Sequence, residues 1–294
     1  MRKKLSRGKA FWFTTATTLV LATGIAIAAT VDLDDTRVKG GGHTAWNSSA
    51  TDNFWCLDTP TPQGTALAEE GKAGDRHDGP DGALMLAVQG EPFTYPDGMG
   101  TKNGETIKAG PDTLSNIRVK VTETAIQDEP AVRMLYSLTN TKGSKATKTV
   151  KMGSNMGSDS DTRIERTSSG DRDFGASDRW VVTSEKPDPL GTLADPPFTN
   201  VLYGKHAGTD VVDVVAKPES LCDHGSFADD VLASFIAKIP AHSTRYLMFF
   251  AEMNQDSNAK AVHEAKKYND RHLSNSLLKG LSNGVRSKIL NWDL

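Results

Sequence analysis

The fold class is decided by a short stretch of alternating residues, positions 117–122, which reads IRVKVT. Its apolar side chains, one isoleucine and two valines, alternate with Arg118, Lys120 and Thr122. Because successive side chains of a β-strand point to opposite faces, this pattern predicts a strand with one buried face and one face in water. The same alternation recurs at residues 132–138, which read VRMLYSL.

Further strand-like runs follow at short intervals along the chain, with no helical pattern between them. A two-residue hairpin turn is indicated by Asn103-Gly104, because both residue types tolerate a positive φ. Clusters of Gly, Pro, Asp and Ser separate the other runs, which lie at residues 84–89, 147–151, 162–167, 179–183, 199–203, 211–215, 231–239 and 245–250. Short strands with regular turn signals predict a mostly β protein, an antiparallel β-sandwich.

The end of the chain has a different period. Apolar residues between 258 and 268 recur at helical spacing, and Ser257 is a suitable N-cap for a helix that begins there. The helical pattern resumes at residues 277–281. We therefore expect a short α-helical C-terminal segment packed on the sandwich.

The N-terminus reads as an export signal. Five basic residues and no acidic residue precede position 10, an apolar run extends to Ala28, and the run ends in the triplet Ala26-Ile27-Ala28. This is the order of a signal peptide over residues 1–28, with an uncleaved membrane anchor as the alternative. Cleavage would leave a secreted, extracellular chain with no membrane span, and would shift the net charge from −3 to −8. No nucleic-acid partner is expected for so acidic a chain.

Three domain-level expectations follow. After the signal peptide, residues 29–82 are polar and rich in Gly, Asp, Thr and Pro, which predicts an irregular N-terminal segment packed on the core. Residues 83–294 form the β-sandwich domain with its C-terminal helices. Cys56 and Cys222 are the two cysteines of the chain, and an oxidising compartment favours a disulfide between them over two separate buried thiols.

One part of the chain resembles known proteins. The stretch 151–171, KMGSNMGSDSDTRIERTSSGD, and the following DRWVVTS at 178–184 are similar to segments of β-rich secreted bacterial proteins without an assigned activity. The resemblance implies export and a β-sandwich fold, and it carries over no catalytic residue.

Acidic residues gather in the same region, where Asp159, Asp161 and Asp171 offer hard oxygen ligands of the kind that Ca²⁺ prefers. Aspartate is also a common turn former that bonds its own backbone, so turn chemistry is the alternative interpretation. No other cofactor is predicted.

Two tryptophans in the polar segment, Trp46 and Trp55, are candidate platforms for a carbohydrate ring, although such residues also anchor long segments to a core. The sequence favours a secreted, non-catalytic protein that binds extracellular carbohydrate or another cell-surface component. The first alternative is a secreted carbohydrate-active enzyme with a carboxylate pair drawn from residues such as Glu123, Glu129, Glu165 and Asp213. The second alternative is a structural envelope protein.

Overall fold

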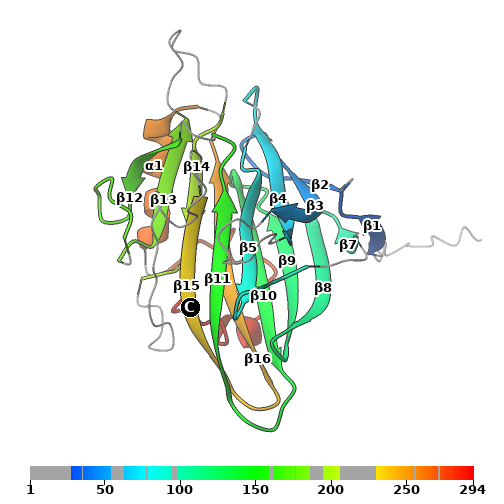
Figure 1. Cartoon of the computed structure of the whole chain (residues 1–294). Helices are drawn as coiled ribbons and strands as arrows, with labels where there is room; N and C mark the ends of the chain where they lie inside the picture. The colour runs from blue at the N-terminus through cyan, green and yellow to red at the C-terminus, as the bar shows by residue number, and fades with distance from the viewer. Residues whose placement is uncertain are drawn as a thin grey trace, which may run out of the picture.

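Two antiparallel sheets stacked face to face make up most of the protein (Figure 1). The computed structural model describes residues 28–34, 36–53, 63–76, 79–94, 98–158, 162–175, 177–185, 195–205, 230–254, 256–270 and 272–294. The predicted fold class, a mostly β antiparallel sandwich with a short helical C-terminal segment, is confirmed.

The larger sheet has nine strands. In spatial order they are β1 (Ala29–Asp32), β7 (Met99–Asn103), β8 (Thr106–Leu114), β9 (Ile117–Ala125), β10 (Ala131–Asn140), β16 (Ser243–Met253), β14 (Phe198–Val201), β13 (Trp180–Glu185) and β12 (Thr162–Thr167).

The smaller sheet has seven strands. Six follow one another in the order β15 (Asp230–Ile239), β11 (Ala146–Asn155), β5 (Gly82–Val88), β4 (Gln63–Ala73), β3 (Thr44–Asn53) and β2 (Arg37–Lys39), and β6 (Glu91–Pro92) pairs with β5.

The main core lies between the two sheets. Phe235 of β15 and Phe249 of β16 meet across it with ring centroids 5.5 Å apart. The hydroxyl of Tyr136 on β10 donates a hydrogen bond of 2.7 Å to the carbonyl of Leu84 on β5. The odd-numbered side chains of β9 face this core and are buried, as the alternation predicts.

Residues 29–82 contain more regular structure than the sequence indicates. The strands β1 to β4 all lie there, and β3 pairs with β4 along most of its length. The pairing shifts register between Ala45 and Asn47, between Asn47 and Ser49, and between Ser49 and Asp52. Each shift breaks the two-residue period, so the alternation that identifies the other strands is absent here.

The C-terminal segment forms a third layer on the outer side of the larger sheet. It contains α1 (Asn258–Ala265), the 3-10 helix η2 (Lys266–Asn269) and α2 (Asn283–Arg286). The hydroxyl of Ser257 accepts a hydrogen bond of 3.2 Å from the backbone N–H of Lys260, as expected of an N-cap. Among the described residues, no helix has the length and apolar character needed to cross a membrane.

A second apolar cluster fixes this layer to the sheet. Phe250 of β16 packs against Tyr268 and Trp292, with ring centroids 5.3 and 5.6 Å away. The side chain of Asn291 accepts a hydrogen bond of 2.9 Å from the N–H of Met248 and donates one of 2.7 Å to its carbonyl. The C-terminal segment therefore covers the outer face along β16, β14 and β13 and leaves the outer face of β8 and β9 open.

Candidate functional site

The open part of the larger sheet presents a polar surface that we call the basic face. It consists of selected outward side chains on three neighbouring strands. They are Lys108 on β8, Arg118, Lys120, Thr122 and Thr124 on β9, and Ser137 and Thr139 on β10. The three cationic side chains are exposed, and the hydroxyl-bearing ones on β9 and β10 are half-buried.

Strand register places these side chains in rows across the sheet. Lys108 lies opposite Thr122, Lys120 opposite Ser137, and Arg118 opposite Thr139. Residues directly opposite one another in an antiparallel pair share a face, so each row sets one cation beside one hydroxyl. Lys120 is also the diagonal neighbour of Lys108, and Arg118 lies two residues from Lys120, so the steps between cations are roughly 7 Å.

The C-terminal segment borders the basic face. Leu135 and Tyr246, which face outward on β10 and β16, pack against this segment. The N–H of Tyr246 donates a hydrogen bond of 3.0 Å to the carbonyl of Lys288. Tyr246 lies opposite Ser137, and Ser137 lies opposite Lys120. The backbone of Lys288 therefore lies at the end of the row that these three residues form across the sheet.

A buried guanidinium holds this border in place. Arg133 on β10 is 3% exposed and donates hydrogen bonds of 2.6 and 3.1 Å to the carbonyls of Leu277 and Lys279. Burial, together with the nearby charge of Arg286, lowers the pKa of Arg133 to about 10. At neutral pH the guanidinium of Arg133 therefore remains charged, which adds positive charge beside the basic face.

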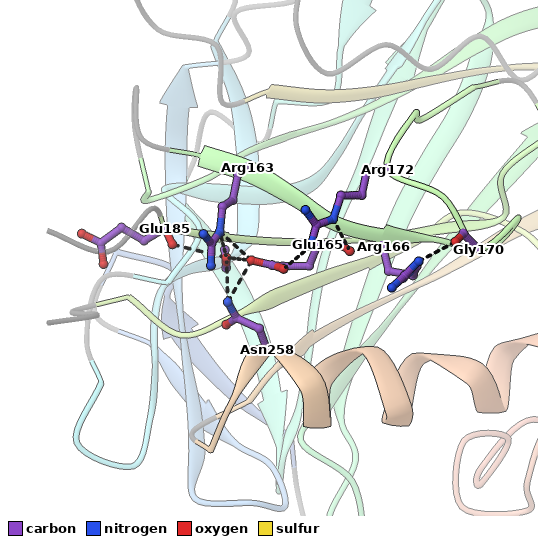
Figure 2. Close-up of polar contacts among 8 residues, drawn as sticks. Arg163, Glu165, Arg166, Gly170, Arg172, Glu185 and Asn258 are labelled. Carbon is purple, nitrogen blue, oxygen red and sulfur yellow. Dashed lines mark hydrogen bonds and ion pairs between the residues drawn. The ribbon is translucent and has the colours of Figure 1, made fainter. Parts of the chain in front are cut away.

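The carboxylates predicted as a possible catalytic pair have other surroundings. Glu165 on β12 forms an ion pair with Arg163 at 2.6 Å and accepts hydrogen bonds from Ser184 and Asn258 at 2.7 and 2.9 Å. Figure 2 shows Arg163, Arg172 and Asn258 converging on this carboxylate from β12, the following loop and the start of α1. With its lone pairs occupied in this way, Glu165 joins β12, β13 and α1.

Glu129 belongs to a second network. The ammonium group of Lys267 lies 2.8 Å from a carboxylate oxygen of Glu129 and also contacts the fully buried carboxylate of Glu252. Burial raises the pKa of Glu252 to about 6, although the charge of Lys267 acts in the opposite direction. The lysine thus bridges two carboxyl groups and joins the β9–β10 turn, β16 and η2.

Glu123 faces the sandwich core from β9. Its side chain is 0% exposed, and neither carboxylate oxygen has a hydrogen-bond partner among the described residues. Burial raises its pKa well above the usual value, because a buried site disfavours the charged form of the carboxyl. Asp213 lies outside the described residues.

The predicted calcium ligands are only partly described. Asp171 accepts hydrogen bonds from the hydroxyl of Thr167 at 2.8 Å and from the N–H of Asp173 at 3.1 Å, which lower its pKa. Such hydrogen bonds to nearby residues are those expected of an aspartate that stabilises a turn. Asp159 and Asp161 lie outside the described residues, within which no group of three acidic, histidine or cysteine side chains is arranged to hold a metal ion. The calcium site stays a prediction.

The tryptophan platform requires a correction at Trp46. This side chain is 0% exposed and packs against Phe198 with ring centroids 6.2 Å apart. The strand β3 directs it into the core, so its ring faces are covered and it anchors its segment. Trp55 and both residues of the expected disulfide, Cys56 and Cys222, lie outside the described residues.

A shallow depression of about 770 Å³ lies beside the glycine triplet Gly40–Gly42. Its lining includes Lys39, His43 and Lys72. The triplet owes its composition to close packing, because a Cβ atom on Gly41 would lie 2.6 Å from the backbone nitrogen of Glu129. These glycines allow the loop to contact the β9–β10 turn.

Comparisons with known proteins show distant similarity in structure. No protein-family model and no curated protein matches the sequence. A solved polysaccharide lyase is similar over 60% of this chain and 26% of its own, with 11% sequence identity and a TM-score of 0.35. The chain thus spans about a quarter of the length of that protein, and a similarity at this level carries no argument about function.

Sequence reasoning identified the water-facing side of residues 117–122 but did not assign it a role. The available signal was the pair of cations at Arg118 and Lys120, which lack an acidic residue between them. Lys108 and the C-terminal border are brought to this face only by long-range strand pairing.

Proposed function

We propose that this protein is an exported, non-catalytic binding protein that holds an extracellular polysaccharide on the basic face. The observation that supports the proposal is the open half of the outer sheet face, where cations and hydroxyl groups alternate in rows. The sequence supports export through the signal peptide expected at residues 1–28.

The chemistry of the basic face suits a polysaccharide. Threonine and serine hydroxyls both donate and accept hydrogen bonds, and lysine and arginine are strong donors, so together they match the hydroxyl and acid groups of a sugar chain. From Arg118 to Thr124 the strand rises by about 20 Å, and neighbouring strands are about 4.8 Å apart. The surface can therefore contact several successive units of a polymer.

Binding rather than catalysis is proposed because of what the basic face contains. Its described outward residues supply cations and hydroxyls, and none of them is a carboxylate of the kind that glycosidases use as acid and base. The carboxylates of Glu129 and Glu165 are engaged elsewhere in ion pairs that join secondary-structure elements.

Affinity electrophoresis through gels that contain single polysaccharides tests the proposal. We expect at least one neutral or acidic polysaccharide to retard the protein, and Thr122→Glu in the centre of the basic face to abolish the retardation. The control is Thr147→Glu, an exposed position on β11 of the smaller sheet. The proposal is contradicted if both variants are retarded equally in every gel that retards the parent protein. It is also contradicted if no gel retards the parent protein.

A further inference from the structure

We infer that the ligand of the basic face is a polyanionic polysaccharide, one whose sugars carry carboxylate or sulfate groups. This inference rests on the proposed function and assigns its ligand class. It begins from an imbalance of charge. The outward residues of the basic face include three cations and no acid, whereas the chain as a whole has a net charge of −3.

The structure pairs the cations of the basic face with no described acidic side chain. Among the described residues, no ion pair joins Lys108, Arg118 or Lys120 to an acidic side chain. Opposite charges on facing strands stabilise a sheet, and like charges that are close together destabilise it. A face that served only to keep the sheet in water would gain stability from an acidic residue at Thr122 or Ser137. Three adjacent cations are better matched by the charges of an external anion.

The border of the basic face extends this charge. Residues 272–292 of the C-terminal segment contain Lys279, Arg286 and Lys288 and no acidic residue. Lys279 and Lys288 are exposed. The hydrogen bond of Arg133 holds the backbone of Lys279 against the outer side of the larger sheet. A β-bridge between Tyr246 and Ile289 holds the backbone of Lys288 beside β16.

The same surface distinguishes a polysaccharide from a nucleic acid. Proteins that hold single-stranded nucleic acid combine a positive groove with exposed aromatic rings on which bases stack. The basic face contains hydroxyl groups where such rings would be needed, and Tyr246 at its border is packed against the C-terminal segment. Hydroxyls and cations together favour an anionic sugar polymer.

The test uses two ligands with the same sugar backbone. Polygalacturonate carries a carboxylate on each sugar, and its methyl ester is neutral. Alginate and chondroitin sulfate are further polyanionic probes, and dextran is a further neutral probe. We expect the full-length protein to bind at least one polyanion at least tenfold more tightly than the neutral polymers. Its affinity should fall as salt increases, because binding releases counterions.

Two triple variants, matched in the charge that they remove, test whether the cations of the basic face bind the polyanion. We expect Lys108→Gln, Arg118→Gln and Lys120→Gln together to reduce polyanion affinity at least tenfold and to flatten the salt dependence. The control combines Lys142→Gln, Lys145→Gln and Lys205→Gln, which remove the same charge at exposed positions elsewhere and should leave affinity unchanged. Far-ultraviolet circular dichroism and melting temperature establish that each variant is folded.

The outcomes separate the inference from the proposed function. Equal binding of polygalacturonate and its methyl ester, unaffected by the first triple variant, would overturn the inference and leave a neutral-polysaccharide function in place. Equal affinity for a DNA duplex at the same salt would overturn the assignment of a polysaccharide. Binding to none of the polymers would contradict the proposed function itself.

Discussion

Arg133 on β10 and Arg286 in α2 both donate hydrogen bonds to the same loop of the C-terminal segment. Arg133 donates hydrogen bonds to the carbonyls of Leu277 and Lys279, and Arg286 donates to those of Leu278 and Leu281 at 3.1 and 3.0 Å. Two guanidinium groups thus satisfy four carbonyls where the C-terminal layer meets the basic face.

We predict that Arg133→Met loosens this layer. The substitution keeps an unbranched side chain but leaves two carbonyls without their donor, at a cost of about 1–3 kcal/mol. Hydrogen exchange should accelerate at residues 272–292 while β9 stays protected. Arg166→Met is the control, since this exposed arginine donates a hydrogen bond to the carbonyl of Gly170 in its own loop. Unchanged exchange in the C-terminal segment of Arg133→Met would contradict the prediction.

The buried carboxyl of Glu123 makes stability depend on pH. Its pKa is raised in the folded state, so the folded protein binds the proton more tightly than the unfolded chain. The resulting stability is complete below the unfolded pKa, near 4.5, and is lost as pH rises towards the raised value.

We therefore expect Glu123→Gln, which cannot ionise, to flatten this decline. Urea unfolding at pH 5 and pH 8 measures the decline in both proteins. A tenfold difference in proton affinity between the folded and unfolded states corresponds to about 1.4 kcal/mol, so from pH 5 to pH 8 the parent should lose at least about 1 kcal/mol more stability than the variant. If parent and variant show parallel pH profiles, the pKa of Glu123 is not raised in the folded state.

Lys267 offers a test of the buried ion network. Lys267→Met leaves the fully buried carboxylate of Glu252 without its counter-charge, which should lower the free energy of unfolding by about 3–5 kcal/mol. The double variant Lys267→Met with Glu252→Gln should recover a large part of that loss, because no buried charge remains. Equal losses in the single and double variants, measured by urea unfolding, would show that the lysine acts through packing alone.

The glycine triplet gives a steric prediction. A Cβ atom on Gly41 would lie 2.6 Å from the nitrogen of Glu129 and 2.7 Å from the carbonyl oxygen of Gln127, both of them backbone atoms. Gly41→Ala should therefore cost about 1–3 kcal/mol of stability. Gly175→Ala is the control, since nothing lies within 4 Å of its added Cβ. Equal melting temperatures for the two variants would argue against close packing of this loop.

Local sequence pattern predicted the parts of the fold that obey a regular period. Residues 117–122 and the helix after Ser257 follow such periods, and both were confirmed. The pattern failed for β3, where register shifts interrupt the alternation and a buried Trp46 lies among polar neighbours. The hairpin at Asn103 was predicted one residue off, because Asn103 pairs with Thr106 and the loop residues are Gly104 and Glu105.

The candidate site depends on contacts that sequence pattern does not encode. Lys108 joins Lys120 through the pairing of β8 with β9, and Lys288 reaches the same row through Tyr246. These contacts are set by the register of strands and the packing of the C-terminal segment. The tryptophans were predicted to bind the ligand from their residue type alone. The position of Trp46 in β3, however, directs its ring into the core.

Lysine footprinting tests most directly whether the basic face is the ligand surface. The protein is acetylated in the presence and absence of a saturating polysaccharide that retards it, and each modified lysine is quantified by mass spectrometry. We predict at least threefold protection of Lys108 and Lys120, with Lys142 and Lys145 modified at unchanged rates. Equal modification of all four lysines with and without the bound polysaccharide would contradict the account.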